Sequence, residues 1–98
     1  MRLPAEANYP RELHIGEETY TIRLVARMPK GYRKGVVGLT DPETKVIYLK
    51  KGMSKALLLR TLIHEILHAI EEEYAVSIKH KKVYRLEKAI VDTLLMNL

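Results

Sequence analysis

Apolar and polar positions alternate along the first half of the chain with the period of two that is typical of β-strands. The alternation predicts strands over 12–15, 19–26, 36–40 and 45–49. Turn-forming residues occupy 16–18 and 41–44, and glycines and a proline among basic residues predict a loop over 28–35. The pattern therefore indicates a small antiparallel sheet built from hairpins.

The period changes to that of an α-helix over 54–74, where Ser54 suits the N-cap position. One half of this helix is apolar: Leu58, Leu59, Leu62, Ile63, Ile66, Leu67, Ala69, Ile70 and Tyr74. The other half carries Arg60, Thr61, His64, Glu65, His68, Glu71 and Glu72. Leu57 and Glu73 depart from this division. We expect the apolar half to face the core and the polar half to face a cleft.

A second helix is predicted over 79–96, after a turn near residues 75–77. Its apolar arc contains Val83, Tyr84, Leu86, Ile90, Val91, Leu94 and Leu95. Two ionisable residues, His80 and Glu87, fall inside that arc. A buried charge is costly without a partner, so both are expected to meet polar groups of the first helix. Together the elements predict an α+β fold.

Composition narrows the kinds of site that the chain can carry. Its 98 residues suit one domain, 1–98, and the absence of cysteine excludes disulfides, thiolate metal sites and cysteine nucleophiles. No apolar run has transmembrane length, and residues 1–10 lack an apolar signal core, so we expect a cytoplasmic protein without membrane contact. The net charge of +5 comes from dispersed Lys and Arg, which favours a solvated surface over a nucleic-acid interface.

The chain's most specific motif is His64-Glu65-Ile66-Leu67-His68, an H-E-x-x-H sequence inside the first predicted helix. Residues four apart lie on the same face of a helix, so the two imidazoles can bind one metal ion. The Glu65 carboxylate can then address a water molecule at that ion. The competing interpretation is a chance motif with two solvated histidines.

A catalytic zinc site usually has three protein ligands and one open position. His80 and Glu87 are the candidates for the third ligand, and an antiparallel second helix would bring either level with His68. Glu72 is a weaker alternative. If His80 is the third ligand, Glu87 would instead orient a ligand histidine or a nearby basic side chain.

The segment Thr61–Ile70 resembles the active-site helix of zincin metallopeptidases. The order of parts over about residues 20–97 is similar to the compact SprT-like and ImmA/IrrE-like group, including small phage-type members, in which a β-hairpin precedes the H-E-x-x-H helix and a final helix follows. The resemblance implies a minimal zincin-like fold and one Zn²⁺ ion. The match of residues 78–80 and 83–86 to the small phage-type pattern favours His80 as the third ligand, whereas Glu87 stands where a gluzincin-like spacing would place one.

The sequence therefore predicts a zinc-dependent metallopeptidase in which Glu65 is the general base and a protein or peptide is the substrate. An extended peptide is expected to add to strand 45–49 if that strand is the sheet edge. Tyr48, Tyr74 and Tyr84 are candidate donors to the developing oxyanion. The alternatives are a catalytically weak zincin-like metal-binding interaction module and a basic nucleic-acid-associated domain. Cobalt, nickel or manganese would also accept such ligands, and oligomeric state is left open.

Overall fold

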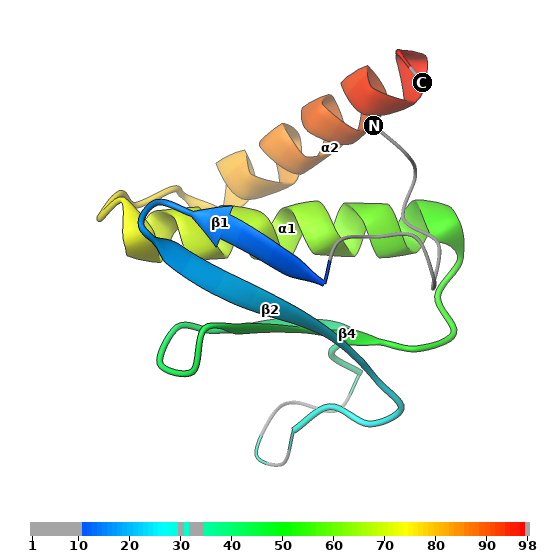
Figure 1. Cartoon of the computed structure of the whole chain (residues 1–98). Coiled ribbons are helices and arrows are strands. Elements are labelled where there is room, and N and C mark those ends of the chain that lie inside the picture. The colour runs from blue at the N-terminus through cyan, green and yellow to red at the C-terminus, as the bar shows by residue number, and fades with distance from the viewer. Residues whose placement is uncertain (1–10, 30, 32–34, 98) are drawn as a thin grey trace.

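The computed structural model describes residues 11–29, 31 and 35–97, and it shows an α+β fold (Figure 1). The elements are β1 (Glu12–Ile15), β2 (Glu18–Val25), β3 (Gly38–Asp41), β4 (Val46–Lys50), α1 (Lys55–Glu73) and α2 (His80–Met96). Each predicted strand and helix is present, with its ends shifted by no more than about two residues, as is usual for boundaries read from sequence. The loop predicted over 28–35 lies partly outside the described residues.

The four strands form one sheet in the order β1-β2-β4-β3. The β1–β2 and β3–β4 pairs are antiparallel hairpins, as predicted. The pairing of β2 with β4 is parallel, with Ile22 opposite Ile47, so the sheet is mixed and not wholly antiparallel. The reason is that the chain leaves β2, crosses to the outer strand β3 and returns through a hairpin into the gap beside β2. A strand that returns in this way runs in the same direction as β2.

The same crossover makes β3 the edge strand and places β4 inside the sheet. Strand 45–49 is therefore not an edge strand, and the condition under which a peptide would add to it is not met. Ile47 and Leu49 are fully buried, as befits an inner strand, whereas all of β3 is partly exposed. Of the two edge strands, β1 and β3, it is β3 that lines a hollow together with His64 and His68 of α1.

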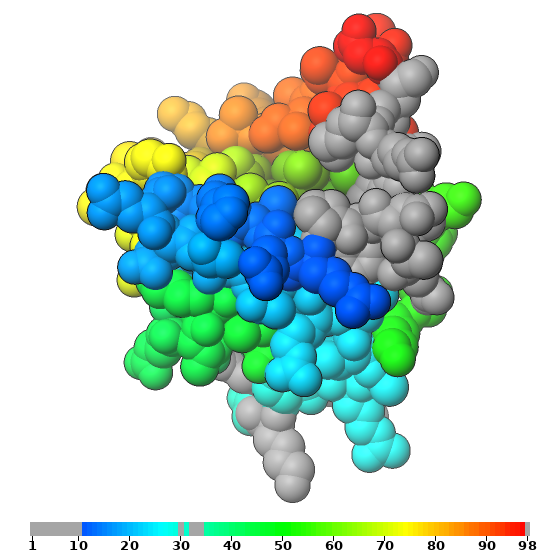
Figure 2. All heavy atoms as spheres, in the orientation of Figure 1, coloured from blue at the N-terminus to red at the C-terminus, as the bar shows by residue number. Residues whose placement is uncertain are grey.

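Helix α1 lies between the sheet and α2, and this position explains its wide apolar half (Figure 1). The N-cap prediction is confirmed, because the Ser54 hydroxyl oxygen accepts a hydrogen bond from the Leu57 amide at 3.2 Å. Leu58, Leu62 and Ala69 pack on the sheet. Leu59, Ile63 and Leu67 pack on Val83 and Val91 of α2. In the space-filling view only a narrow band of α1 is visible between β1 and α2 (Figure 2).

Some side chains of the predicted apolar faces are exposed. Tyr74, at the end of α1, is 58% exposed, and Tyr84, Leu86 and Leu95 of α2 are also exposed. The cause is that, among the described helices and strands, α2 packs mainly against α1, so only part of its surface is covered. Among residues 11–29, 31 and 35–97, no helix combines the length and the apolar character that a membrane crossing needs.

Candidate metal centre

His64 and His68 stand one turn apart on α1, and their imidazoles face each other. The two Nε2 atoms lie 3.1 Å apart. Both side chains are partly exposed, His64 at 15% and His68 at 33%, so the pair borders solvent without being fully solvated. The helical spacing of the motif thus brings the two imidazoles together on one face of α1, as the sequence predicted.

Each of these histidines has a carboxylate on its other ring nitrogen. The Nδ1 atom of His64 lies 2.7 Å from Glu87 Oε1, and that of His68 lies 2.9 Å from Glu71 Oε1. An ionised carboxylate only accepts, so each Nδ1 carries the proton and each Nε2 presents a lone pair. Two lone pairs at 3.1 Å repel each other. A cation between them, whether a proton or a metal ion, removes that repulsion.

His80 is the first residue of α2 and lies beside this pair. Its ring centroid is 5.9 Å from that of His64 and 5.8 Å from that of His68. The ligand atoms of the three histidines all lie within 4.8 Å of one another, so the group could hold a metal ion. Tetrahedral zinc with Zn–N bonds of 2.0–2.1 Å sets its nitrogens about 3.3 Å apart. The α1 pair lies close to that spacing, and the exposed His80 side chain, within 4.8 Å, would have to move closer to meet it.

The structure places Glu87 behind the pair, in the position of an orienting group. Its Oε1 atom accepts from His64, and its Oε2 atom accepts from Arg60 at 3.1 and 3.3 Å. Glu87 is 5% exposed, so both oxygens are occupied by protein donors in a buried setting. Glu72 is exposed and does not belong to the histidine group. Of the three candidates for a third ligand, His80 is the one that lies with His64 and His68.

Glu65 is buried between α1 and the edge strand, at 7% exposure. The Thr40 hydroxyl of β3 lies 2.9 Å from Glu65 Oε1 and 2.9 Å from the Glu65 carbonyl oxygen. Burial raises the pKa of the Glu65 carboxyl, and the hydrogen bond from Thr40 and the nearby His64 and His68 work in the opposite direction. Thr61 is buried as well, so the polar half of α1 is not wholly open to a cleft, because β3 covers part of it.

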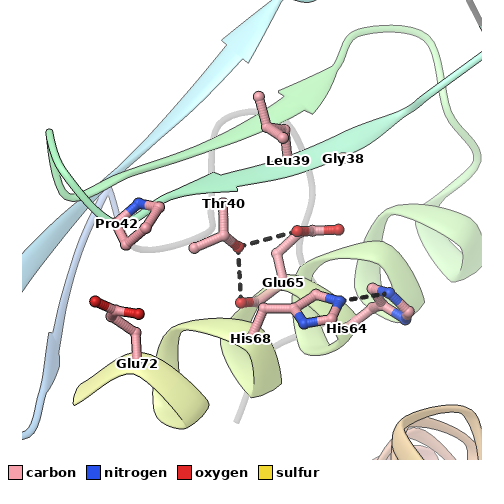
Figure 3. Close-up of a pocket in the computed structure, with 8 residues that line it drawn as sticks. All are labelled: Gly38, Leu39, Thr40, Pro42, His64, Glu65, His68 and Glu72. Atoms are coloured by element: carbon pink, nitrogen blue, oxygen red, sulfur yellow. Dashed lines mark hydrogen bonds between the residues drawn. The ribbon is translucent and has the colours of Figure 1, made fainter. Parts of the chain in front are cut away.

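Two hollows meet at Glu65. One of about 390 Å³ opens between the Thr40 side of β3 and the face of α1 that carries His64 and His68 (Figure 3). The other, of about 460 Å³, extends toward α2, where Leu57 and Tyr84 line it. His64 and Glu65 border both hollows. The two hollows together form a groove along β3, and the candidate site lies where they join.

Comparison with protein-family models, with curated proteins and with solved structures finds no match to this chain. The zincin resemblance therefore rests on the H-E-x-x-H motif and on the order of the elements.

Of the three tyrosines proposed as donors, only Tyr84 lies at the histidines. Its ring centroid is 5.3 Å from those of both His64 and His80. Tyr48 lies in the inner strand β4, and Tyr74 borders a separate hollow beside β1.

Sequence reasoning did not identify Thr40, Gly38 or Glu71 as parts of the site. Glu71 has a usable signal, because it stands three residues after His68 and so shares its helix face. Gly38 has a weaker one, since glycine inside a strand often marks close approach of another element. Thr40 has none, because its contact with Glu65 depends on how the sheet packs on α1.

Proposed function

We propose that this chain is a zinc-dependent metallopeptidase in which His64, His68 and His80 bind the metal and Glu65 is the general base. The observation that carries the proposal is the pair of Nε2 atoms 3.1 Å apart, with a third imidazole within 4.8 Å and the Glu65 carboxylate lining the same hollow. A site that only holds a metal has no use for that carboxylate.

The donor set fits zinc. Three neutral imidazoles form a common catalytic zinc site and leave one position open for water or substrate. Bound zinc supplies Lewis-acid polarisation of a peptide carbonyl and lowers the pKa of a water molecule to about 7. The carboxylates of Glu71 and Glu87 keep the protons on Nδ1, so the Nε2 atoms of His68 and His64 stay ready to bind.

The proton transfers fall to Glu65. Its carboxylate takes a proton from the attacking water and delivers it to the nitrogen of the departing amine. Burial raises the pKa of the Glu65 carboxyl and so makes its carboxylate a stronger base than an exposed one. A base whose pKa lies nearer to neutral pH can both take a proton from water and pass it on. Tyr84, whose ring lies 5.3 Å from that of His64, is the candidate donor to the oxygen that becomes negative on the attacked carbonyl.

The substrate that fits this groove is an extended peptide. Among the described residues, β3 pairs only with β4, so its outer edge can pair with a further strand. The hollow toward α2 is partly apolar and can receive a side chain of that peptide, with Leu57 and Tyr84 as its walls.

The test is hydrolysis of a random library of internally quenched peptides by zinc-loaded protein. Glu65→Gln should lower the rate about 10²- to 10⁴-fold, because the proton acceptor is lost while the metal ligands stay. Glu17→Gln, a matched change in an exposed turn, should leave the rate unchanged. Equal rates in the wild type and in Glu65→Gln would contradict the role of Glu65. Stoichiometric zinc without hydrolysis by the wild type would contradict the peptidase and leave a metal-binding interaction module.

A further inference from the structure

The edge strand approaches Glu65 unusually closely at two positions. Thr40 reaches Glu65 through its hydroxyl, 2.9 Å from Oε1. Two residues earlier in the strand, Gly38 lies against the same side chain. A Cβ atom added at Gly38 would come 3.0 Å from Glu65 Oε2 and 2.5 Å from the Cγ2 atom of Thr61. Since real Cβ atoms essentially never approach a neighbour within 3.0 Å, only glycine allows this packing.

These contacts distinguish the two oxygens of the Glu65 carboxylate. Oε1 accepts a hydrogen bond from Thr40, whose single hydroxyl proton is shared between Oε1 and the Glu65 carbonyl oxygen. Oε2 faces the position where Gly38 has no side chain. Gly38 and Glu65 line both hollows, so this space belongs to the groove.

We propose that Thr40 is a positioning residue of this site: its hydroxyl anchors Oε1 of Glu65 and leaves Oε2 as the oxygen that takes the proton. The inference rests on the proposed function. The water oxygen forms its bond to the carbonyl carbon as the carbonyl π electrons move to the carbonyl oxygen, and the water's proton passes to Oε2. The C=O bond then re-forms as the C–N bond breaks, and the same proton passes from Oε2 to the amine nitrogen.

The physical reason is the freedom of a glutamate side chain. Three side-chain torsions separate its carboxylate from the backbone. Without an anchor the carboxylate can therefore present either of its oxygens to the water, or turn away from the histidines. Misplacement of a reacting group by about 1 Å can cost about 100-fold in rate. The Thr40 bond joins the carboxylate to the backbone of α1 and to the edge strand at once, which fixes its direction.

The test compares Thr40→Val, which keeps the shape and removes the hydroxyl, with Thr40→Ser, which keeps the hydroxyl. We expect Thr40→Val to lower kcat about 10- to 100-fold with KM changed less than about threefold, because substrate contacts remain and only the direction of the base is lost. Thr40→Ser should restore kcat to within a few-fold of the wild type. Thr21→Val, an equivalent change on an exposed position of β2, should have no effect. Zinc content should be the same in all four proteins.

A second measurement does not depend on activity. In crystal structures of the two variants, Glu65 should leave its place beside Gly38 in Thr40→Val and keep it in Thr40→Ser. The proposal is overturned if Glu65 stays in place in Thr40→Val, if kcat is unaffected there, or if serine fails to rescue. Movement of Glu65 as expected in a protein that cleaves no peptide would support the anchor and count against the peptidase, so the two failures are distinguishable.

Discussion

The carboxylates that contact His64 and His68 set the orientation and the tautomer of the two imidazole rings. Glu87 comes from the neighbouring helix and Glu71 from the same helix, and each holds an Nδ1 proton. Glu71 does more, because its Oε2 atom accepts from the Ile78 amide at 3.0 Å, in the segment that leads to His80. The orientation of His68 and the position of the segment that leads to His80 are therefore linked through the Glu71 side chain.

Removing one of these carboxylates should weaken metal binding without removing a ligand. Glu87→Gln is expected to lower zinc affinity about 10- to 100-fold, because a neutral amide replaces the carboxylate that accepts from His64 Nδ1 and raises the basicity of the ring. Competition with a chromophoric chelator measures that affinity. Asp92→Asn, on an exposed position of the same helix, is the matched control and should bind as the wild type does. An unchanged affinity in Glu87→Gln would show that Glu87 does not support the site.

At the scale of elements, α1 is the support of the whole site. It packs on the sheet with one side and on α2 with the other, and it carries the motif along the border between the two. Loss of packing between α1 and α2 should therefore lower the stability of the protein. It should also displace His80, the first residue of α2, from His64 and His68.

Leu59→Ala tests that packing. Leu59 is fully buried between the helices, so the cavity left by the change should lower the free energy of unfolding by about 2–5 kcal/mol. Leu86→Ala makes the same chemical change at a side chain that is 41% exposed, and should cost less than about 1 kcal/mol. Urea denaturation followed by circular dichroism gives both values. Equal losses in the two variants would contradict the described α1–α2 interface.

A second support joins the end of α1 to the sheet. Glu73 Oε2 accepts from Lys45 Nζ and from the buried Tyr20 hydroxyl, each at 2.6 Å. Lys45 and then Tyr20 hold the pKa of the Glu73 carboxyl below its usual value, so the folded protein binds that proton less readily than the unfolded chain does. The resulting stabilisation is complete above the usual pKa of a glutamate and is lost as the pH falls through the lower folded pKa.

Glu73→Gln should therefore be less stable than the wild type at pH 7, and the gap should narrow as the pH is lowered below 4. Urea denaturation at a series of pH values measures it, with Glu17→Gln as an exposed control that should follow the wild type throughout. A gap that stays constant or widens on acidification would show that the ionised form of Glu73 is not what stabilises this end of the helix.

At the scale of the whole molecule, the sequence predicted what depends on local spacing. The two helices follow from apolar periodicity, and the meeting of His64 with His68 follows from a separation of one helical turn. The hairpins follow from turn residues between alternating segments. These features need no knowledge of which distant segments touch.

Features that depend on distant segments were missed. The parallel pairing of β2 with β4 and the place of β3 at the edge arise from the crossover between β2 and β3, which leaves no periodic trace in the sequence. Because β3 lies on α1, Glu65 is buried where an open polar face was expected, and Thr40 becomes its partner. The apolar arc of the second helix predicted that Glu87 would be buried and would need a partner. That its partners are Arg60 and His64 could be seen only in the folded structure.

Metal content per chain is the most direct test of a metal site made of His64, His68 and His80. After dialysis against zinc and removal of free metal, elemental analysis should find about one zinc ion in the wild type and little in His64→Ala or His80→Ala. His14→Ala, an exposed histidine of β1, should keep the full amount. A wild type that holds no zinc would contradict the account, as would full occupancy in His64→Ala and His80→Ala.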